Sequence, residues 1–216
     1  QVGTLGSLSL LEPIRHSENK IKFYQASSSE MYGGQTNKKL NEESLFDPKS
    51  PYAASKVFAH DITKIYRESY NLFCVNGILF NHESPFRGET FVTRKISKAV
   101  GRIHLGLQNK LTLGNLDASR DWGFAGDYIE GMWLMMQHDE AEDWVLATGK
   151  SYKVSEFAEE AFNQVGLDWS DYVKTSEKYL RPNEVDYLLG DSSKAEKKLG
   201  WKAKTHSQPE FVETES

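Results

Sequence analysis

The sequence lacks the features of secreted and membrane proteins. Cys74 is the single cysteine among 216 residues, so no disulfide can form within the chain, and a reducing compartment is expected. No apolar run is long enough to cross a bilayer, and residues 1–11 lack the basic start of a signal peptide. The chain does not begin with Met, as expected of a fragment or a processed product. These absences predict a cytoplasmic protein with no membrane contact.

The sequence also lacks metal-binding patterns and an excess of positive charge. One cysteine and six scattered histidines do not give the ligand spacing of a zinc site. The formal net charge of −5 argues against nonspecific nucleic-acid binding as the main task. No G-x-S-x-G elbow is present, which disfavours a hydrolase of that kind. We therefore expect no metal cofactor and no nucleic-acid partner.

The pattern of the remaining residues predicts an α/β protein. Hydrophobic residues make up 38% and charged residues 26%, as in soluble globular domains. Alternating strands and helices indicate a mainly parallel sheet. Later segments are shorter and more polar, as in a small substrate-binding lobe. Strands are expected at 21–26, 73–79, 110–113 and 144–147; helices at 5–14, 51–70, 91–107, 127–137, 154–165 and 192–199; and loops at 33–51 and 81–89.

Tyr52 and Lys56 form a Y-x-x-x-K pair at the start of the predicted helix 51–70. Residues four apart on a helix share one face. An ammonium beside a phenol favours phenolate, which can accept a proton from a sugar hydroxyl. Such a pair also occurs on ordinary exposed helices, so its spacing alone does not establish redox chemistry on an alcohol.

The run from Ser27 to Glu30 strengthens the interpretation of this pair. It ends a predicted strand, and ligands in parallel α/β sheets bind outside the carboxyl ends of the strands. A serine run is also typical of turns and helix caps. Together with Tyr52 and Lys56, however, it favours a functional site that contains Ser28 and Glu30.

These motifs resemble the extended short-chain dehydrogenase/reductase enzymes that modify nucleotide sugars, and among them the GDP-mannose 4,6-dehydratases. The resemblance extends over nearly the whole chain, with two departures. Ser28 stands where the family usually has threonine but keeps the hydroxyl, and Phe86 replaces a usually basic residue, which predicts weaker binding by its loop. The matching stretches are 23–33, 50–53, 77–85, 87–95, 120–123 and 179–182.

The resemblance implies a dehydratase mechanism with NADP as cofactor. Tyr52, assisted by Lys56, would take the proton of the sugar C4 hydroxyl while the C4 hydride passes to NADP+. Glu30 would remove the C5 proton, and it or a relay would protonate the departing C6 hydroxyl. Hydride would then return to C6, giving GDP-4-keto-6-deoxymannose, and Ser28 would orient the C4 oxygen. The net reaction is that of a lyase, on the route to GDP-fucose and related deoxyhexoses.

The resemblance also implies binding residues and a domain division. Residues 1–110 would form a partial Rossmann-like domain with the catalytic residues, and residues 111–216 mainly a substrate-binding lobe interleaved with it. A homo-oligomer, dimer or tetramer, is implied as well. The cofactor residues would be Tyr52, Lys56, His82 and Arg87, and the GDP-mannose residues would be Asn81, Lys95, Arg120, Arg181 and Glu184.

The family's fold begins with a glycine-rich loop that this sequence does not show. Gly3 and Gly6 are spaced wrongly for that loop and follow no predicted strand. We therefore expect a first half on the order of 100 residues to lie outside the chain. Two alternatives stay open: a related nucleotide-sugar epimerase or reductase, which would need no carboxylate at Glu30, and an inactive fragment that binds a full-length subunit.

Overall fold

A three-stranded parallel sheet lies at the centre of the fold. The computed structural model describes residues 3–34, 38–180, 183 and 185–204. Strands β1 (Phe23–Ser28), β2 (Cys74–Leu79) and β7 (Asp143–Leu146) follow the order β1-β2-β7. Their register places Ser28 beside Leu79 and Leu79 beside Leu146, so the three strands end at one common edge. The predicted α/β class with a parallel sheet is confirmed.

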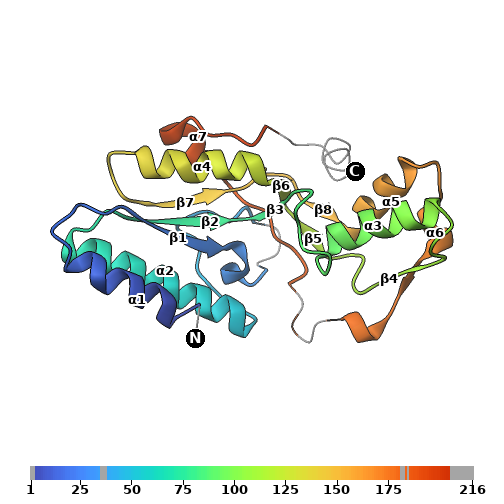
Figure 1. Ribbon diagram of the computed structural model, residues 1–216, viewed down its shortest axis with the longest axis horizontal. Helices are drawn as coiled ribbons and strands as arrows, with labels where there is room; N and C mark the ends of the chain where they lie inside the picture. Colours follow the sequence, from blue (N-terminus) through green and yellow to red (C-terminus); the bar gives the residue numbers. More distant parts are fainter. Residues whose placement is uncertain (1–2, 35–37, 181–182, 184, 205–216) are drawn as a thin grey trace.

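Helices cover both faces of this sheet. Helices α1 (Leu5–Arg15) and α2 (Pro51–Tyr70) lie on one face, and α4 (Ala125–Gln137) and α7 (Ser193–Leu199) on the other (Figure 1). Strand β2 is buried along its whole length between these layers, and Cys74 at its start packs among apolar side chains, as expected for a small hydrophobe. The architecture is therefore doubly wound.

Helix α2 has clear start and stop signals in its sequence. The Ser50 hydroxyl accepts a hydrogen bond from the Ala53 N–H, and Pro51 occupies the first turn, where its missing N–H costs no hydrogen bond. Asn71 ends the helix in the left-handed conformation, with φ of 52°. Because α2 connects two parallel strands, it runs back along the sheet and begins at the edge where the strands end.

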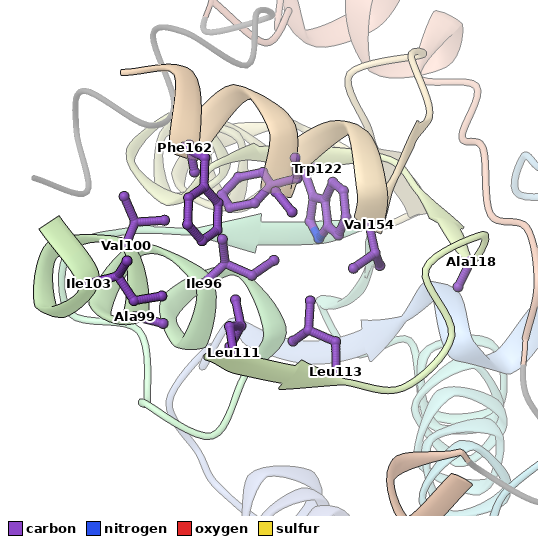
Figure 2. Close-up of a cluster of buried hydrophobic side chains, with 13 residues drawn as sticks. Ile96, Ala99, Val100, Ile103, Leu111, Leu113, Ala118, Trp122, Val154 and Phe162 are labelled. Carbon is purple, nitrogen blue, oxygen red and sulfur yellow. The ribbon is translucent and has the colours of Figure 1, made fainter. Parts of the chain in front are cut away.

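A second apolar cluster forms a smaller lobe beside the sheet. Helices α3 (Val92–His104), α5 (Val154–Asn163) and α6 (Trp169–Tyr172) pack with β4 (Leu111–Leu113) and β9 (Val173–Thr175). Figure 2 shows the buried side chains of α3, α5 and β4, with Trp122 among them, filling the space between α3 and α5. This lobe takes segments from both sides of residue 110, and α4, β7 and α7 return to the sheet. The domain division at residue 110 remains a prediction.

Short elements connect the two parts, and one of them corrects the sequence prediction. Residues 81–89 were expected to be a loop, but Asn81–Glu83 form β3, which pairs in parallel with β6 (Trp122–Phe124). Three residues show no periodicity, and the partner strand lies far away in the sequence. The remaining short elements are β5 (Ser119–Arg120), β8 (Tyr152–Lys153), and the 3-10 helices η1 (Ser29–Tyr32) and η2 (Glu177–Tyr179).

Several predicted boundaries also shift, those of the first strand and of α3 among them. The first strand covers Phe23–Ser28 rather than 21–26, because its pairing with β2 begins at Phe23 opposite Cys74. Helix α3 ends at His104 rather than Leu107, and Gly106 follows with a positive φ of 70°. Among the described residues, no helix combines the length and hydropathy needed to cross a bilayer.

Candidate active site at the carboxyl edge of the sheet

Ser28 and Glu30 lie where β1 turns into η1. Ser28 is the last residue of the strand and caps η1: its Oγ accepts a hydrogen bond from the Glu30 N–H at 3.3 Å. Gly33 ends η1 with φ of 67°, and a Cβ there would lie 1.8 Å from the Asp47 carbonyl oxygen. The tight turn thus holds the serine hydroxyl and the glutamate at the edge of the sheet, where parallel α/β folds bind ligands.

Tyr52 and Lys56 reach the same edge from the first turns of α2. The Lys56 ammonium donates a hydrogen bond to the Ala26 carbonyl oxygen at 2.8 Å and lies 5.7 Å from the centroid of the Tyr52 ring. Partial burial lowers the pKa of Lys56. Tyr52 is 55% exposed, so its phenol is accessible to a ligand. The structure therefore brings this pair to the strand that carries Ser28.

Asn81 and His82 follow the end of β2 at this edge, within β3. The His82 Nδ1 donates to the Phe80 carbonyl oxygen at 2.8 Å, and the ring stacks on Tyr128 with centroids 4.8 Å apart. Burial lowers the pKa of His82, so its ring is neutral near pH 7. With the proton on Nδ1, Nε2 is left as a hydrogen-bond acceptor.

Arg87 is held by a carboxylate that sequence reasoning missed. Its Nε lies 2.9 Å from the Glu83 Oε2, and its guanidinium lies 3.6 Å from the Phe91 ring centroid. Glu83 is only 2% exposed and also accepts a hydrogen bond from the Thr93 hydroxyl at 2.8 Å. The Glu83 ion pair and the contact with the Phe91 ring hold the guanidinium in a loop beside the site. The signal for Glu83 was its place in the matched 77–85 stretch.

The predicted GDP-mannose residues are distributed over a wider region. Lys95 donates from α3 to the Thr112 carbonyl oxygen at 2.6 Å and lies 4.2 Å from the Tyr179 ring centroid. Arg120 is buried and donates to the Ser119 carbonyl oxygen at 3.0 Å. Lys95 therefore lies in the smaller lobe, and Arg120 lies in β5, which pairs with β8. Arg181 and Glu184 lie outside the described residues.

The described residues contain no cluster of three or more His, Cys, Asp or Glu side chains that could hold a metal ion. The groups that converge at the sheet edge are instead a hydroxyl, a carboxylate, a phenol and an ammonium. Such a set can move protons to and from an alcohol and its neighbouring carbon.

Comparison with known proteins decides the family. The family model described as GDP-mannose 4,6 dehydratase matches residues 1–213. The chain belongs to the GDP-mannose 4,6-dehydratase family. GDP-mannose 4,6 dehydratase 1 of Arabidopsis thaliana is 57% identical over 203 residues, which are 92% of this chain and 56% of the relative. The human GDP-mannose 4,6 dehydratase is 49% identical, over 93% of this chain and 59% of the relative.

Solved structures share the fold of this dehydratase-family chain. RMD from Pseudomonas aeruginosa, solved with NADPH, superposes with a TM-score of 0.88 at 23% identity, over 98% of this chain and 71% of that one. The dTDP-glucose 4,6-dehydratase DesIV from Streptomyces venezuelae, solved with NAD and TYD, gives 0.87 at 22% identity, over 98% and 64%. The chain spans 54–63% of the length of the curated relatives it matches.

Proposed function

We propose that the whole protein converts GDP-mannose to GDP-4-keto-6-deoxymannose with NADP as cofactor. The observation that carries this proposal is the convergence of Ser28, Glu30, Tyr52 and Lys56 at one edge of the sheet. The family match over residues 1–213 supports it. The reaction would be the first step of GDP-fucose and deoxyhexose synthesis and would take place in the cytoplasm.

In this mechanism the chain's own residues handle the protons. Tyr52 accepts the proton of the C4 hydroxyl, and the Lys56 ammonium stabilises the resulting phenolate. Ser28 donates a hydrogen bond to the C4 oxygen and keeps it oriented. NADP+, when bound, would supply the hydride acceptor that C4 oxidation needs and the hydride donor that C6 reduction needs. Glu30 removes the C5 proton, which the C4 ketone has made acidic, and it or a relay protonates the C6 hydroxyl, which leaves as water. C5 takes up a proton again when C6 is reduced.

The residues at the edge fit a nicotinamide dinucleotide. His82 has a fixed ring orientation, and the Arg87 guanidinium, which is ion-paired with Glu83, carries N–H donors in a planar fork that suits phosphate oxygens. Among relatives in fold, RMD was solved with NADPH and DesIV with NAD. The choice of NADP rests on Arg87 and on the family resemblance. Parallel titrations of the whole protein with NADP+ and NAD+ test it, and tighter binding of NAD+ would contradict it.

We propose further that the smaller lobe binds the sugar nucleotide. Lys95 and Arg120 provide the positive charge that a diphosphate requires, with Asn81 at the sheet edge and Arg181 and Glu184 as the remaining candidates. The protein is proposed to assemble as a homo-oligomer, a dimer or tetramer. Exposed apolar side chains of α1 and α2, Leu10, Phe58 and Ile65, support a contact between copies. Light scattering of the whole protein tests this, and a monomer would contradict it.

The reaction itself is tested by incubating the whole protein with GDP-mannose and NADP+ and analysing the product by mass spectrometry. A product lighter by one water molecule supports the dehydratase. An isomer of unchanged mass would instead indicate an epimerase, and Glu30 would then have no role in elimination. A product with no loss of water sinks the proposal.

One observation favours a second role for the 216-residue chain. In this role the chain binds to a full-length subunit. Within the described residues, β1 has no strand on the side away from β2, so its outer backbone groups can accept another strand. Mixing the 216-residue chain with the whole protein tests this by size-exclusion chromatography. A stable mixed complex supports the binding role, whereas two separate peaks exclude it.

A further inference from the structure

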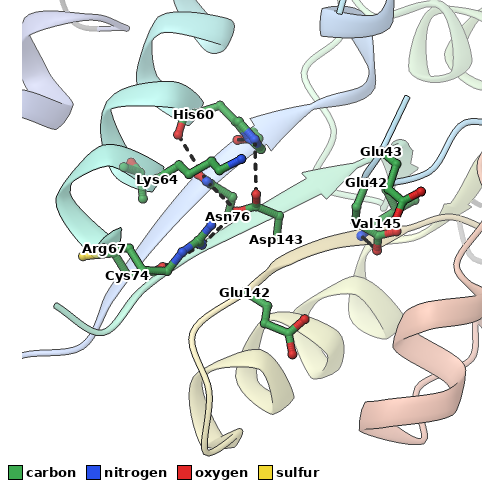
Figure 3. A network of polar contacts seen from close by, with 12 residues as sticks. Glu42, Glu43, His60, Lys64, Arg67, Cys74, Asn76, Glu142, Asp143 and Val145 are labelled. Atoms are coloured by element: carbon green, nitrogen blue, oxygen red, sulfur yellow. Dashed lines mark hydrogen bonds and ion pairs between the residues drawn. The ribbon is translucent and has the colours of Figure 1, made fainter. Parts of the chain in front are cut away.

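A buried histidine lies one helical turn beyond Lys56. Tyr52, Lys56 and His60 follow one another at intervals of four residues, so they share one face of α2. His60 is 4% exposed, and its Nδ1 lies 3.0 Å from the Ser27 Oγ. Ser27 directly precedes Ser28 in β1. The imidazole therefore connects α2 to β1 through Ser27, and Figure 3 shows its other contact, with Asp143.

The other ring nitrogen of His60 faces a carboxylate at the start of β7. Nε2 lies 3.6 Å from the Asp143 Oδ2. Arg67 and Asn76 hold the second carboxylate oxygen, at 2.9 and 2.8 Å, and the Asn76 side chain also donates to the His60 carbonyl oxygen at 3.2 Å. We call Ser27, His60, Arg67, Asn76 and Asp143 the buried network. It joins α2 to all three strands of the sheet.

The protons of the buried network have a definite arrangement. Burial alone would raise the pKa of Asp143, but the hydrogen bonds from Arg67 and Asn76 hold it below its usual value, so Asp143 is a carboxylate. Burial lowers the pKa of His60, so the ring is neutral. The negative charge facing Nε2 favours the tautomer with the proton on that nitrogen. Nδ1 then accepts a hydrogen bond from the Ser27 hydroxyl.

The order serine, histidine, aspartate suggests a hydrolase triad, but the geometry excludes one. In such triads the serine meets Nε2 and the aspartate meets Nδ1. Here the ring is reversed, with Ser27 on Nδ1 and Asp143 on Nε2. Ser27 is also 4% exposed, so no substrate can reach its hydroxyl. The contacts of His60 join structural elements rather than reacting atoms.

We propose that His60 is a positioning residue that sets the Tyr52–Lys56 pair against Ser28 and Glu30. The inference rests on the proposed dehydratase function. His60 fixes the register of α2 on β1, and this register allows the Lys56 ammonium to reach the Ala26 carbonyl oxygen. Without His60, the first turns of α2 would shift along the strand. A displacement of about 1 Å between reacting groups can lower the rate about 100-fold.

The test compares variants of the whole protein. His60→Phe removes both ring contacts at similar volume, and His60→Asn keeps a polar atom near the Nδ1 position. Thr63→Val is the matched control, because Thr63 is also buried on α2 but, within the described residues, its hydroxyl bonds only to Ala59 of its own helix. We expect kcat of His60→Phe to fall about 10- to 100-fold with an unchanged KM for GDP-mannose. Partial recovery in His60→Asn and near-normal turnover in Thr63→Val should accompany this loss.

A second readout separates positioning from general destabilisation. Moving Lys56 relative to Tyr52 changes the phenol's surroundings, so the pH profile of kcat should shift in His60→Phe and not in Thr63→Val. A wild-type kcat and pH profile in His60→Phe would overturn the proposal, as would an equal loss in the control. If His60→Phe does not fold, Ser27→Ala takes its place, because it removes a single hydrogen bond.

The outcomes remain distinguishable if the proposed function is wrong. Wild-type protein that releases no water refutes the dehydratase, whatever the variants do. Positioning by His60 is then decided by amide hydrogen exchange of residues 52–57. Exchange that is faster in His60→Phe than in Thr63→Val supports it, and identical exchange overturns it.

Discussion

We call the edge that carries Ser28, Glu30, Tyr52 and Lys56 the catalytic edge, after its proposed role. The catalytic edge and the buried network include neighbouring residues with opposite surroundings. Ser27 and Ser28 are adjacent in β1, yet alternation along the strand sends their side chains to opposite faces of the sheet. Ser27 is buried and bonded to His60, whereas Ser28 is half-buried at the edge with Glu30. The edge keeps its polar groups available for a ligand. The network pairs most of its polar groups with one another, as burial favours, although the Asn76 Oδ1 has no hydrogen-bond partner among the described residues.

The largest effect is expected from a substitution that removes a group from the catalytic edge and leaves the buried network intact. Glu30→Gln removes the carboxylate proposed to take the C5 proton, so elimination should fall about 100- to 10,000-fold. Oxidation at C4, followed as NADPH absorbance in a single turnover, should fall much less. The melting temperature should stay near the wild-type value, because Glu30 is partly exposed. Unchanged release of water would exclude Glu30 as the base.

The next largest effect breaks the network. Asp143→Ala leaves Arg67 and His60 without their shared carboxylate, and losing one partner of a buried ion pair costs about 3–5 kcal/mol of unfolding free energy. Urea unfolding of the whole protein measures the loss. Glu142→Ala is the matched control on the preceding residue: it pairs with the more exposed Lys194 and Lys198, so about 1 kcal/mol or less is expected. Equal losses of unfolding free energy in the two variants would contradict the stronger role of Asp143.

A smaller effect tests the carboxylate that anchors Arg87. Glu83→Gln keeps the size of the side chain but removes the charge that faces the guanidinium. A guanidinium released from this ion pair should lose a hydrogen bond to a cofactor phosphate, and because such bonds to charged groups contribute about 1.5–3 kcal/mol, cofactor affinity should fall about 10-fold or more. Calorimetry with NADP+ measures it, with Glu89→Gln as the control because Glu89 is largely exposed and pairs with Lys98. Equal affinity in wild type and Glu83→Gln would show that the anchor has no role in binding.

The smallest expected effect is a pH dependence of stability due to the network. His60 resists protonation when folded, so as pH falls below about 6.5 the unfolded chain binds the proton first and stability decreases. Burial dominates this shift; Asp143 and Asp61 oppose it, whereas Arg67 and Lys64 add to it. His82 contributes in the same direction.

The contribution of His60 can be isolated by substitution. Urea unfolding at pH 7 and pH 5 should show a smaller loss of stability in His60→Asn than in wild type. His82→Asn is the parallel variant for the edge. If His60→Asn keeps the full wild-type pH dependence, His60 is not the neutral buried group described above.

Sequence patterns located the catalytic edge because each of its signals lies within a single strand or helix. Apolar runs predicted β1 and β2, the proline at 51 predicted the start of α2, and parallel topology brings strand ends together. Strand β3 was not predicted, because three residues carry no periodicity and its pairing with Trp122 depends on a distant segment.

The buried network was not predicted from the sequence, for a different reason. Its members lie far apart in the sequence: 33 residues separate Ser27 from His60, and 76 separate Arg67 from Asp143. Periodicity within one element cannot show such partners. Its signals were polar residues where apolar ones were expected. Asn76 interrupts the apolar run of β2, and His60 continues the face of Tyr52 and Lys56 into the protein.

The central claim is that one edge of the sheet oxidises C4, eliminates water and reduces C6 without releasing the cofactor. GDP-mannose carrying deuterium at C4, incubated with the whole protein and unlabelled NADP+ in ordinary water, tests this most directly. NMR of the product should show the deuterium at C6 of the 4-keto-6-deoxy sugar. Deuterium found in free NADPH, lost to water or still at C4 would contradict the claim.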